Sequence, residues 1–184
     1  SVMQLGVEVV DFFGDLLIRE QTSDARGLST DLLVSLGIRH LFNIGQEDVV
    51  AADSYFAQAN EIRERGLHWA WRAQARTIQR VELHADDLRD VRDEGAYFAE
   101  RALALDPNNS MVLALCANAY HILLLDHLRG IELASRAIQI NPLNPMAWWA
   151  QSSARLYLGD MDGAYKDALR GRYLVSKSSY RFWW

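Results

Sequence analysis

The sequence is poor in the residues that cross-link a chain or break helices. It has one cysteine and three prolines in 184 residues. The single cysteine, Cys116, excludes an internal disulfide, and its apolar neighbours Leu113 and Leu115 are typical of a buried thiol rather than a catalytic one. No proline interrupts a long helical pattern. Because disulfides are rare in a reducing compartment, we expect a cytoplasmic protein.

The sequence also lacks long uncharged apolar runs and long runs of like charge. The most apolar stretch, Val2 to Ile18, is interrupted by three carboxylates, so it predicts a soluble helix over 2–20 rather than a membrane span. The formal net charge of -5 argues against a general nucleic-acid surface, because phosphate binding needs an excess of Lys and Arg. We therefore expect contact with neither a membrane nor nucleic acid.

Patterns of catalytic and metal sites are missing as well. The sequence contains neither a His-Glu-x-x-His pattern nor a Cys-x-x-Cys pair nor a phosphate-binding glycine loop. The nearest approach to a ligand cluster is His84 with Asp86 and Asp87, for which a solvated loop is the simpler interpretation. We therefore predict a protein that is not an enzyme and that needs no cofactor or metal.

The sequence does contain a repeated pattern of mostly small residues. Four sets share the spacing i, i+4, i+7, and they are Ala52, Phe56, Ala59; Gly95, Ala99, Ala102; Gly130, Ala134, Ala137; and Ala164, Ala168, Gly171. Successive sets begin 43, 35 and 34 residues apart (52 to 95, 95 to 130, 130 to 164). An interval near 34 residues predicts stacked helix hairpins, with the small residues where the two helices of a hairpin touch. The longer first interval predicts an insertion of about nine residues near His84 to Asp90.

Residues that typically begin or end helices agree with this organisation. Pro107 and Pro142 each follow the last small residue of a set by five positions, and a helix ends there because the residue before proline avoids the α region. Asn144 followed by Pro145 predicts a capped helix start. We expect helices at 2–20, 29–44, 47–64, 67–87, 91–105, 110–124, 127–140, 144–158 and 161–175, and one that starts near 178.

This pattern resembles the tetratricopeptide repeat (TPR) family. The last full repeat, PMAWWAQSSARLYLGDMDGAYKDALRG, is similar to that family in Trp148, in the turn at Leu158, Gly159 and Asp160, and in Ala164. The other repeats are aligned on Leu36-Gly37, on Trp71, and on Leu113, Cys116, Ala117 and Tyr120. The resemblance covers residues 30 to 176. It implies an all-α fold, an α-α superhelix of helix hairpins with an extra N-terminal helix.

The implied organisation is an N-terminal helix and linker over 1–28, about four repeats over 29–176, and the start of a further helix over 177–184. The implied function is a protein-interaction scaffold that binds a partner protein or peptide in a concave groove formed by the first helix of each hairpin, helix A. Trp71 and Trp148 are then expected to be buried between helices. Trp69 and Trp149 would point toward the groove or solvent.

With Trp71 in the family's helix A position, three arginines spaced by four fall on the stripe that faces this groove. The groove residues implied by the alignment are Arg72, Arg76, Arg80, Asn118, His121 and Trp149. Since arginine pairs well with carboxylates, an acidic peptide is the expected ligand. A solvated arginine face paired with acids such as Glu82 explains the stripe equally well.

A second function is also open. The phrase DLLVSLGIRHLF…EDVVAADSYFAQA is similar to the C-terminal TPR regions of bacterial multidomain regulators, of the transcriptional-regulator or adenylate-cyclase type. This resemblance implies a regulatory or self-association module of a larger protein. Apolar segments at both ends, Val2–Ile18 and Tyr180–Trp184, predict a homodimer contact or burial by another part of a longer protein. The sequence alone does not choose between groove and self-association.

Overall fold

The computed structural model describes residues 30–43, 45–82 and 88–175. Across these residues the chain forms eight helices and no strand, which confirms the all-α prediction for this part of the chain. The helices expected at 2–20 and from 178 lie outside the described residues, as do the apolar segments Val2–Ile18 and Tyr180–Trp184.

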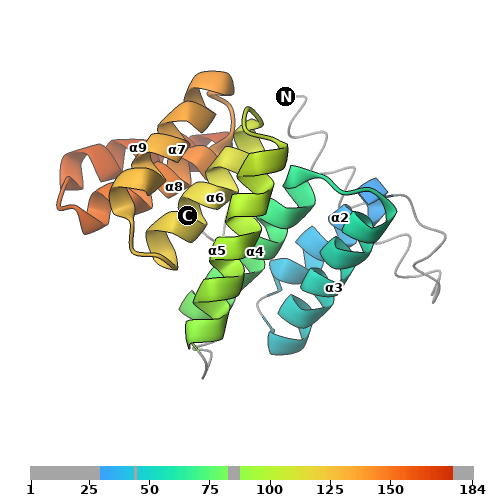
Figure 1. The fold of residues 1–184 in the computed structure, drawn as a ribbon. Coiled ribbons are helices and arrows are strands. Elements are labelled where there is room, and N and C mark those ends of the chain that lie inside the picture. Colours follow the sequence, from blue (N-terminus) through green and yellow to red (C-terminus); the bar gives the residue numbers. More distant parts are fainter. Residues whose placement is uncertain (1–29, 44, 83–87, 176–184) are drawn as a thin grey trace.

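Consecutive helices pair as four hairpins that stack in chain order (Figure 1). The hairpins are α2 (Thr30–Leu41) with α3 (Gln46–Ile62), α4 (Gly66–Val81) with α5 (Leu88–Leu105), α6 (Ser110–Ile122) with α7 (His127–Ile140), and α8 (Pro145–Tyr157) with α9 (Met161–Leu174). The first helices of the last three hairpins lie side by side, α4 against α6 and α6 against α8. This arrangement is an α-α superhelix. The first hairpin joins it mainly through α3, which packs on α4.

Short polar side chains fix where the later helices begin. Asn109 caps α6 by accepting hydrogen bonds from the backbone N–H groups of Met111 and Val112. Asn144 caps α8 in the same way, as predicted, and is followed by proline at the first helical position. Each cap satisfies amide groups that have no partner inside the helix. Gly159 ends the turn after α8 with φ +83°, a conformation that glycine adopts without strain.

The predicted small-residue sets lie where the helices of each hairpin meet. Eleven of the twelve residues are buried, and Ala168 is half-buried. Hydroxyl groups bind the first helix to the second at these places, because Ser110 Oγ donates to the Ala137 carbonyl at 2.8 Å and Ser152 Oγ donates to the Ala164 carbonyl at 2.7 Å. The repeat pattern therefore marks the helix–helix contacts, as predicted.

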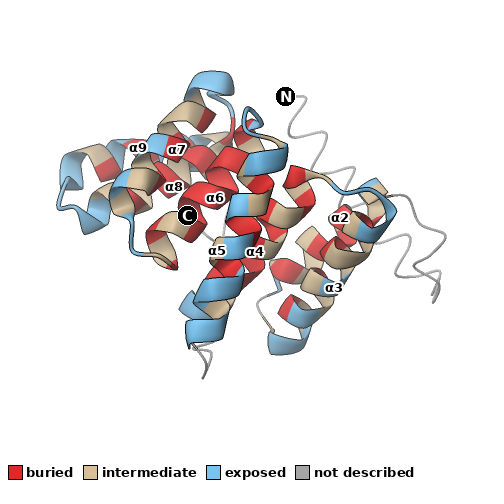
Figure 2. Ribbon diagram, in the orientation of Figure 1, coloured by how far each residue is buried: buried red, intermediate tan, exposed pale blue. Residues whose placement is uncertain are grey.

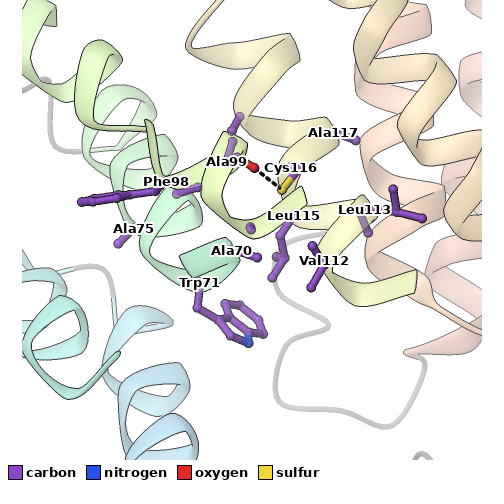
Figure 3. Close-up of a cluster of buried hydrophobic side chains, with 14 of the residues drawn as sticks. Ala70, Trp71, Ala75, Phe98, Ala99, Val112, Leu113, Leu115, Cys116 and Ala117 are labelled. Atoms are coloured by element: carbon purple, nitrogen blue, oxygen red, sulfur yellow. Dashed lines mark hydrogen bonds between the residues drawn. The ribbon is translucent and has the colours of Figure 1, made fainter. Parts of the chain in front are cut away.

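The centre of the stack is its most buried part. Every residue of α6 from Val112 to Ala119 is without solvent contact, and Figure 2 shows the buried colour continuing from α6 onto α4. Figure 3 shows Cys116 directed at α5, where its thiol lies 3.6 Å from the Ala99 carbonyl. Burial raises the pKa of this thiol, so Cys116 is the small buried side chain that the sequence predicts.

The second hairpin contains the predicted insertion, but not as a simple loop. α4 and α5 have 16 and 18 residues, against 13 and 14 in α6 and α7, so the extra residues lengthen both helices. Leu88 to Asp90, expected in the insertion, are the first residues of α5. His84, Asp86 and Asp87 lie outside the described residues.

Candidate interaction surface

The contacts of α4 show that its residues align with those of α6 differently from the alignment on Trp71. Gly66 lies against α5, since a Cβ there would be 2.6 Å from the Ala102 carbonyl oxygen. In the next hairpin Ser110 contacts the equivalent carbonyl of Ala137. Matching these two contacts aligns Trp69, rather than Trp71, with the third hairpin's Leu113. The alignment from sequence is therefore two residues out in α4.

The two-residue shift in the alignment explains how Trp69 and Trp71 pack. Trp71 is buried, as expected, but its ring packs on the first hairpin, 6.1 Å from the Phe56 ring and 6.5 Å from the Phe42 ring. Trp69 instead packs on α5, against Tyr97 and Phe98.

Two of the predicted groove arginines are turned away from an open face. Arg72 donates two hydrogen bonds to Asp53 of α3, at 2.7 and 3.3 Å. Arg76 donates to the same carboxylate at 2.9 Å and to Glu94 of α5 at 2.6 Å. Both guanidinium groups also lie over the Phe98 ring, at 4.2 and 5.3 Å. Arg72 and Arg76 therefore join three helices inside the chain, and their acids are Asp53 and Glu94 rather than Glu82.

Burial acts to raise the pKa of Asp53, but the Arg72 and Arg76 guanidinium groups outweigh this effect and hold the pKa below its usual value. Asp53 is thus a carboxylate shared by two cations at the junction of the first and second hairpins. Such a group stabilises the junction only while both cations are present.

The other predicted groove residues on α4, α6 and α8 differ in their exposure. Arg80 is exposed and Trp149 is half-buried. Asn118 is fully buried and donates to the Gln74 side chain at 3.2 Å, between α6 and α4. Its Oδ1 atom has no hydrogen-bond partner in the described structure.

Trp148 is predicted to be buried between helices, and the structure differs. It is half-buried, and its indole N–H donates to the Pro142 carbonyl at 2.8 Å. The neighbouring small residues Ala147 and Ala150 occupy the buried positions of α8 instead.

His121 belongs to a histidine pair that the sequence analysis does not predict, because its partner lies on another helix. His121 Nδ1 is 2.7 Å from His127 Nδ1, and His121 Nε2 is 2.9 Å from Ser153 Oγ. The Tyr157 ring covers both imidazoles, with ring centroids 5.0 and 5.3 Å away. Each nitrogen of His121 thus has a partner within the fold, whichever tautomer it adopts.

Burial, together with the charge that His127 can carry, lowers the pKa of His121 to about 4. The imidazole is therefore neutral at pH 7 and links α6 to α7 and α8 by hydrogen bonds. Within the described residues, no group of three or more His, Cys, Asp or Glu side chains is arranged to hold a metal ion.

Among the described residues, the largest concentration of exposed apolar side chains is at the last hairpin. Met161, Tyr165, Leu169 and Tyr173 recur every four residues along α9, with exposed fractions of 63, 66, 41 and 73 %. We call these four residues the α9 face. The end of α8 adds the exposed residues Leu156, Tyr157 and Leu158. The sequence analysis does not predict this surface, because the same stretch contains the small residues that position α9 against α8.

Two residues of the α9 face, Leu169 and Tyr165, have counterparts that are covered in other hairpins. In the repeat, Ser135 of α7 corresponds to Leu169 (135 plus 34), and it is covered by α8, whose Gln151 donates to it at 2.6 Å. Asp53 of α3 corresponds to Tyr165 by its place next to the first small residue of its set, and it is covered by Arg72 of α4. The equivalent positions of α9 are open.

A comparison with models of known protein families found no match, and a comparison with curated proteins found none either. No helix in the described part of the chain is both long and apolar enough to cross a membrane.

Proposed function

We propose that this chain is a protein-interaction scaffold and that a partner protein binds at the α9 face. The observation that carries this proposal is the contrast between the hairpin junctions and the last hairpin. Ser135 and Asp53 are covered by a following helix, whereas their counterparts Leu169 and Tyr165 are exposed. A contiguous apolar patch of this kind on a protein surface usually marks an interface.

The energetics favour such a contact. Fully burying one large apolar side chain contributes about 1.5–3 kcal/mol. Four partly exposed side chains can therefore offset the cost of association only enough for a weak protein complex. The counterparts of Leu169 and Tyr165, Ser135 and Asp53, each receive a helix, which favours a helix of the partner at the centre of the α9 face.

A groove along the first helices has less support as the contact surface. Arg72 and Arg76 are already paired with carboxylates of this chain, and Asn118 and His121 are buried. An acidic peptide would have to displace Asp53 to reach the two arginines. A contact at the end of the stack also suits the alternative of a regulatory module, because the end of a stack can be covered or left open without unfolding the hairpins.

Site-specific photocrosslinking in the native cell tests this proposal. A benzophenone amino acid placed at Tyr165 should crosslink to a defined partner, because the ring would lie inside the interface. The matched control is the same amino acid at Val50, which is 59 % exposed on α3, far along the chain from the α9 face. Crosslinking from Val50 as strong as from Tyr165, or none from either position, would contradict the proposal.

A further inference from the structure

We propose that the partner at the α9 face is a second copy of this chain, so that two α9 helices pack antiparallel across a two-fold axis. This inference rests on the proposed function and names its partner. It follows from the order of side chains along α9. When two copies of this helix run antiparallel, apolar residues face apolar residues and acidic residues face basic ones.

The apolar row is symmetric about its midpoint, which falls at residue 167. When one copy is reversed against the other, Met161 meets Tyr173 of the partner subunit, and Tyr165 meets Leu169 of the partner subunit. Each contact then occurs twice. Because the row runs along an i, i+4 ridge, two copies pack ridge beside ridge with the helices crossing at about −50°, the commonest helix-packing geometry in globular proteins.

The charges at the two ends of the neighbouring ridge are also complementary under the same two-fold axis. Asp162, Lys166 and Arg170 form the neighbouring i, i+4 ridge, and all three are exposed. None of them forms an ion pair with another residue of the described structure. Reversing one helix about residue 167 places Asp162 opposite position 172 of the partner subunit, next to its Arg170, and it does so twice per dimer. A parallel arrangement would instead place like charges together.

The same charge order complements the dipole of a single helix, which favours acids at the N-terminus and bases at the C-terminus. The dipole, however, does not account for an exposed row of Met, Tyr, Leu and Tyr beside those charges. A self-complementary interface accounts for both rows.

The size of the patch predicts a weak dimer. Tyrosine rings bury about 150–250 Å² each, so the four side chains at their observed exposures supply roughly 500 Å² per copy. A standard stable interface takes about 800 Å² from each partner. We therefore expect a dimer that dissociates in the micromolar range, on the order of 1–100 μM.

Sedimentation velocity on the 184-residue chain over a concentration series tests the dimer. The parent protein should shift from monomer to dimer as concentration rises. Leu169→Glu should raise the dissociation constant about tenfold or more, because it places a carboxylate at the centre of the apolar contact. Val50→Glu, an equivalent change at an exposed position of α3, should leave the dissociation constant unchanged.

A charge swap tests the antiparallel arrangement itself. Asp162→Lys and Arg170→Glu should each weaken the dimer, and the double variant should restore it, because each new cation again faces a new anion across the two-fold axis. Weakening by both single changes without restoration in the double variant would overturn the antiparallel pairing.

Three further results would overturn the inference. The first is a parent chain that stays monomeric at every concentration, and the second is a Leu169→Glu variant that dimerises as the parent does. If the chain is monomeric while Tyr165 still crosslinks to a different protein, the proposed function stands and the second copy is excluded. The third is a Leu169→Glu variant that melts at a clearly lower temperature than the parent at a concentration where both are monomeric, which would show the face covered by its own chain and contradict both proposals.

Discussion

At the scale of single residues, Asp53 shows how one carboxylate orients a whole helix. Its oxygens accept hydrogen bonds from Arg72 and Arg76, and Glu94 holds the other side of Arg76. The side chains of Asp53 and Arg76 are 17 and 11 % exposed, so neither charge would be well solvated alone. Arg72 and Arg76 are therefore part of the hairpin junction, and replacing them should lower the free energy of unfolding.

Charge reversal at Arg76 is expected to destabilise the fold, whereas a groove residue would tolerate it. Arg76→Glu places a third carboxylate beside Asp53 and Glu94 in a mostly buried site, which should lower the free energy of unfolding by about 3 kcal/mol or more. The matched control is Arg80→Glu, one turn along the same helix and exposed, where a change within about 0.5 kcal/mol is expected. Urea denaturation measures both. Equal stabilities of the two variants would contradict this account of the arginines.

The pair of His121 and His127 predicts a loss of stability in mild acid. The folded pKa of His121 is about 4, below the value of about 6.5 for the unfolded chain, so the unfolded state binds more protons between these pH values. The contribution of neutral His121 to the free energy of unfolding is therefore complete above about pH 6.5 and is lost progressively as the pH is lowered toward 4. Between pH 7 and pH 5 the expected loss is about 2 kcal/mol.

His121→Gln isolates this effect, because glutamine retains hydrogen-bonding groups and does not titrate. Urea denaturation at pH 7 and pH 5 should show a smaller loss for the variant than for the parent chain. A loss of the same size in both proteins would assign the acid sensitivity to other groups.

At the scale of helices, the fold depends on a few positions where two helices touch. Ala137 has no exposed surface, and its carbonyl accepts the Ser110 hydroxyl across the hairpin junction. Gly66 lies so close to the Ala102 carbonyl that a Cβ would be at 2.6 Å. A small side chain at such a position is required by the distance between the helices.

Ala137→Leu should therefore force α7 away from α6 and lower the free energy of unfolding by about 1–3 kcal/mol. The control is Gln139→Leu on the exposed side of the same helix. Thermal melts followed by circular dichroism give the comparison. Identical melting temperatures for Ala137→Leu and the parent would show that the small residue is not at a tight contact.

Local signals along the sequence were enough to predict the described helices within a few residues at most ends. Proline at 107 and 142 and the Asn144 cap act within one turn, so they can be read from neighbouring residues. The small-residue sets were also predicted, because direct contact of two helices leaves a strict spacing. The faces of α4 could not be read in the same way, since Trp69 and Trp71 are both plausible at one position and only the contact of Gly66 with α5 decides between them.

At the scale of the whole molecule, the described residues form a stack of four hairpins, and the side chains of the α9 face are exposed. Two earlier junctions are closed by a polar or ionic contact, Asp53 with Arg72 and Ser135 with Gln151. The α9 face carries apolar side chains at the corresponding positions. This contrast is the basis of the proposed contact at the α9 face.

The most direct test of this account is hydroxyl-radical footprinting of the tyrosines in the assembled protein. Tyr165 and Tyr173, 66 and 73 % exposed, should be strongly protected when the chain is in its native assembly and become reactive on dilution. Tyr97, 53 % exposed on α5, should react at the same rate under both conditions. Equal reactivity of Tyr165 and Tyr173 in the assembled and diluted states would contradict the claim that the α9 face is an interface.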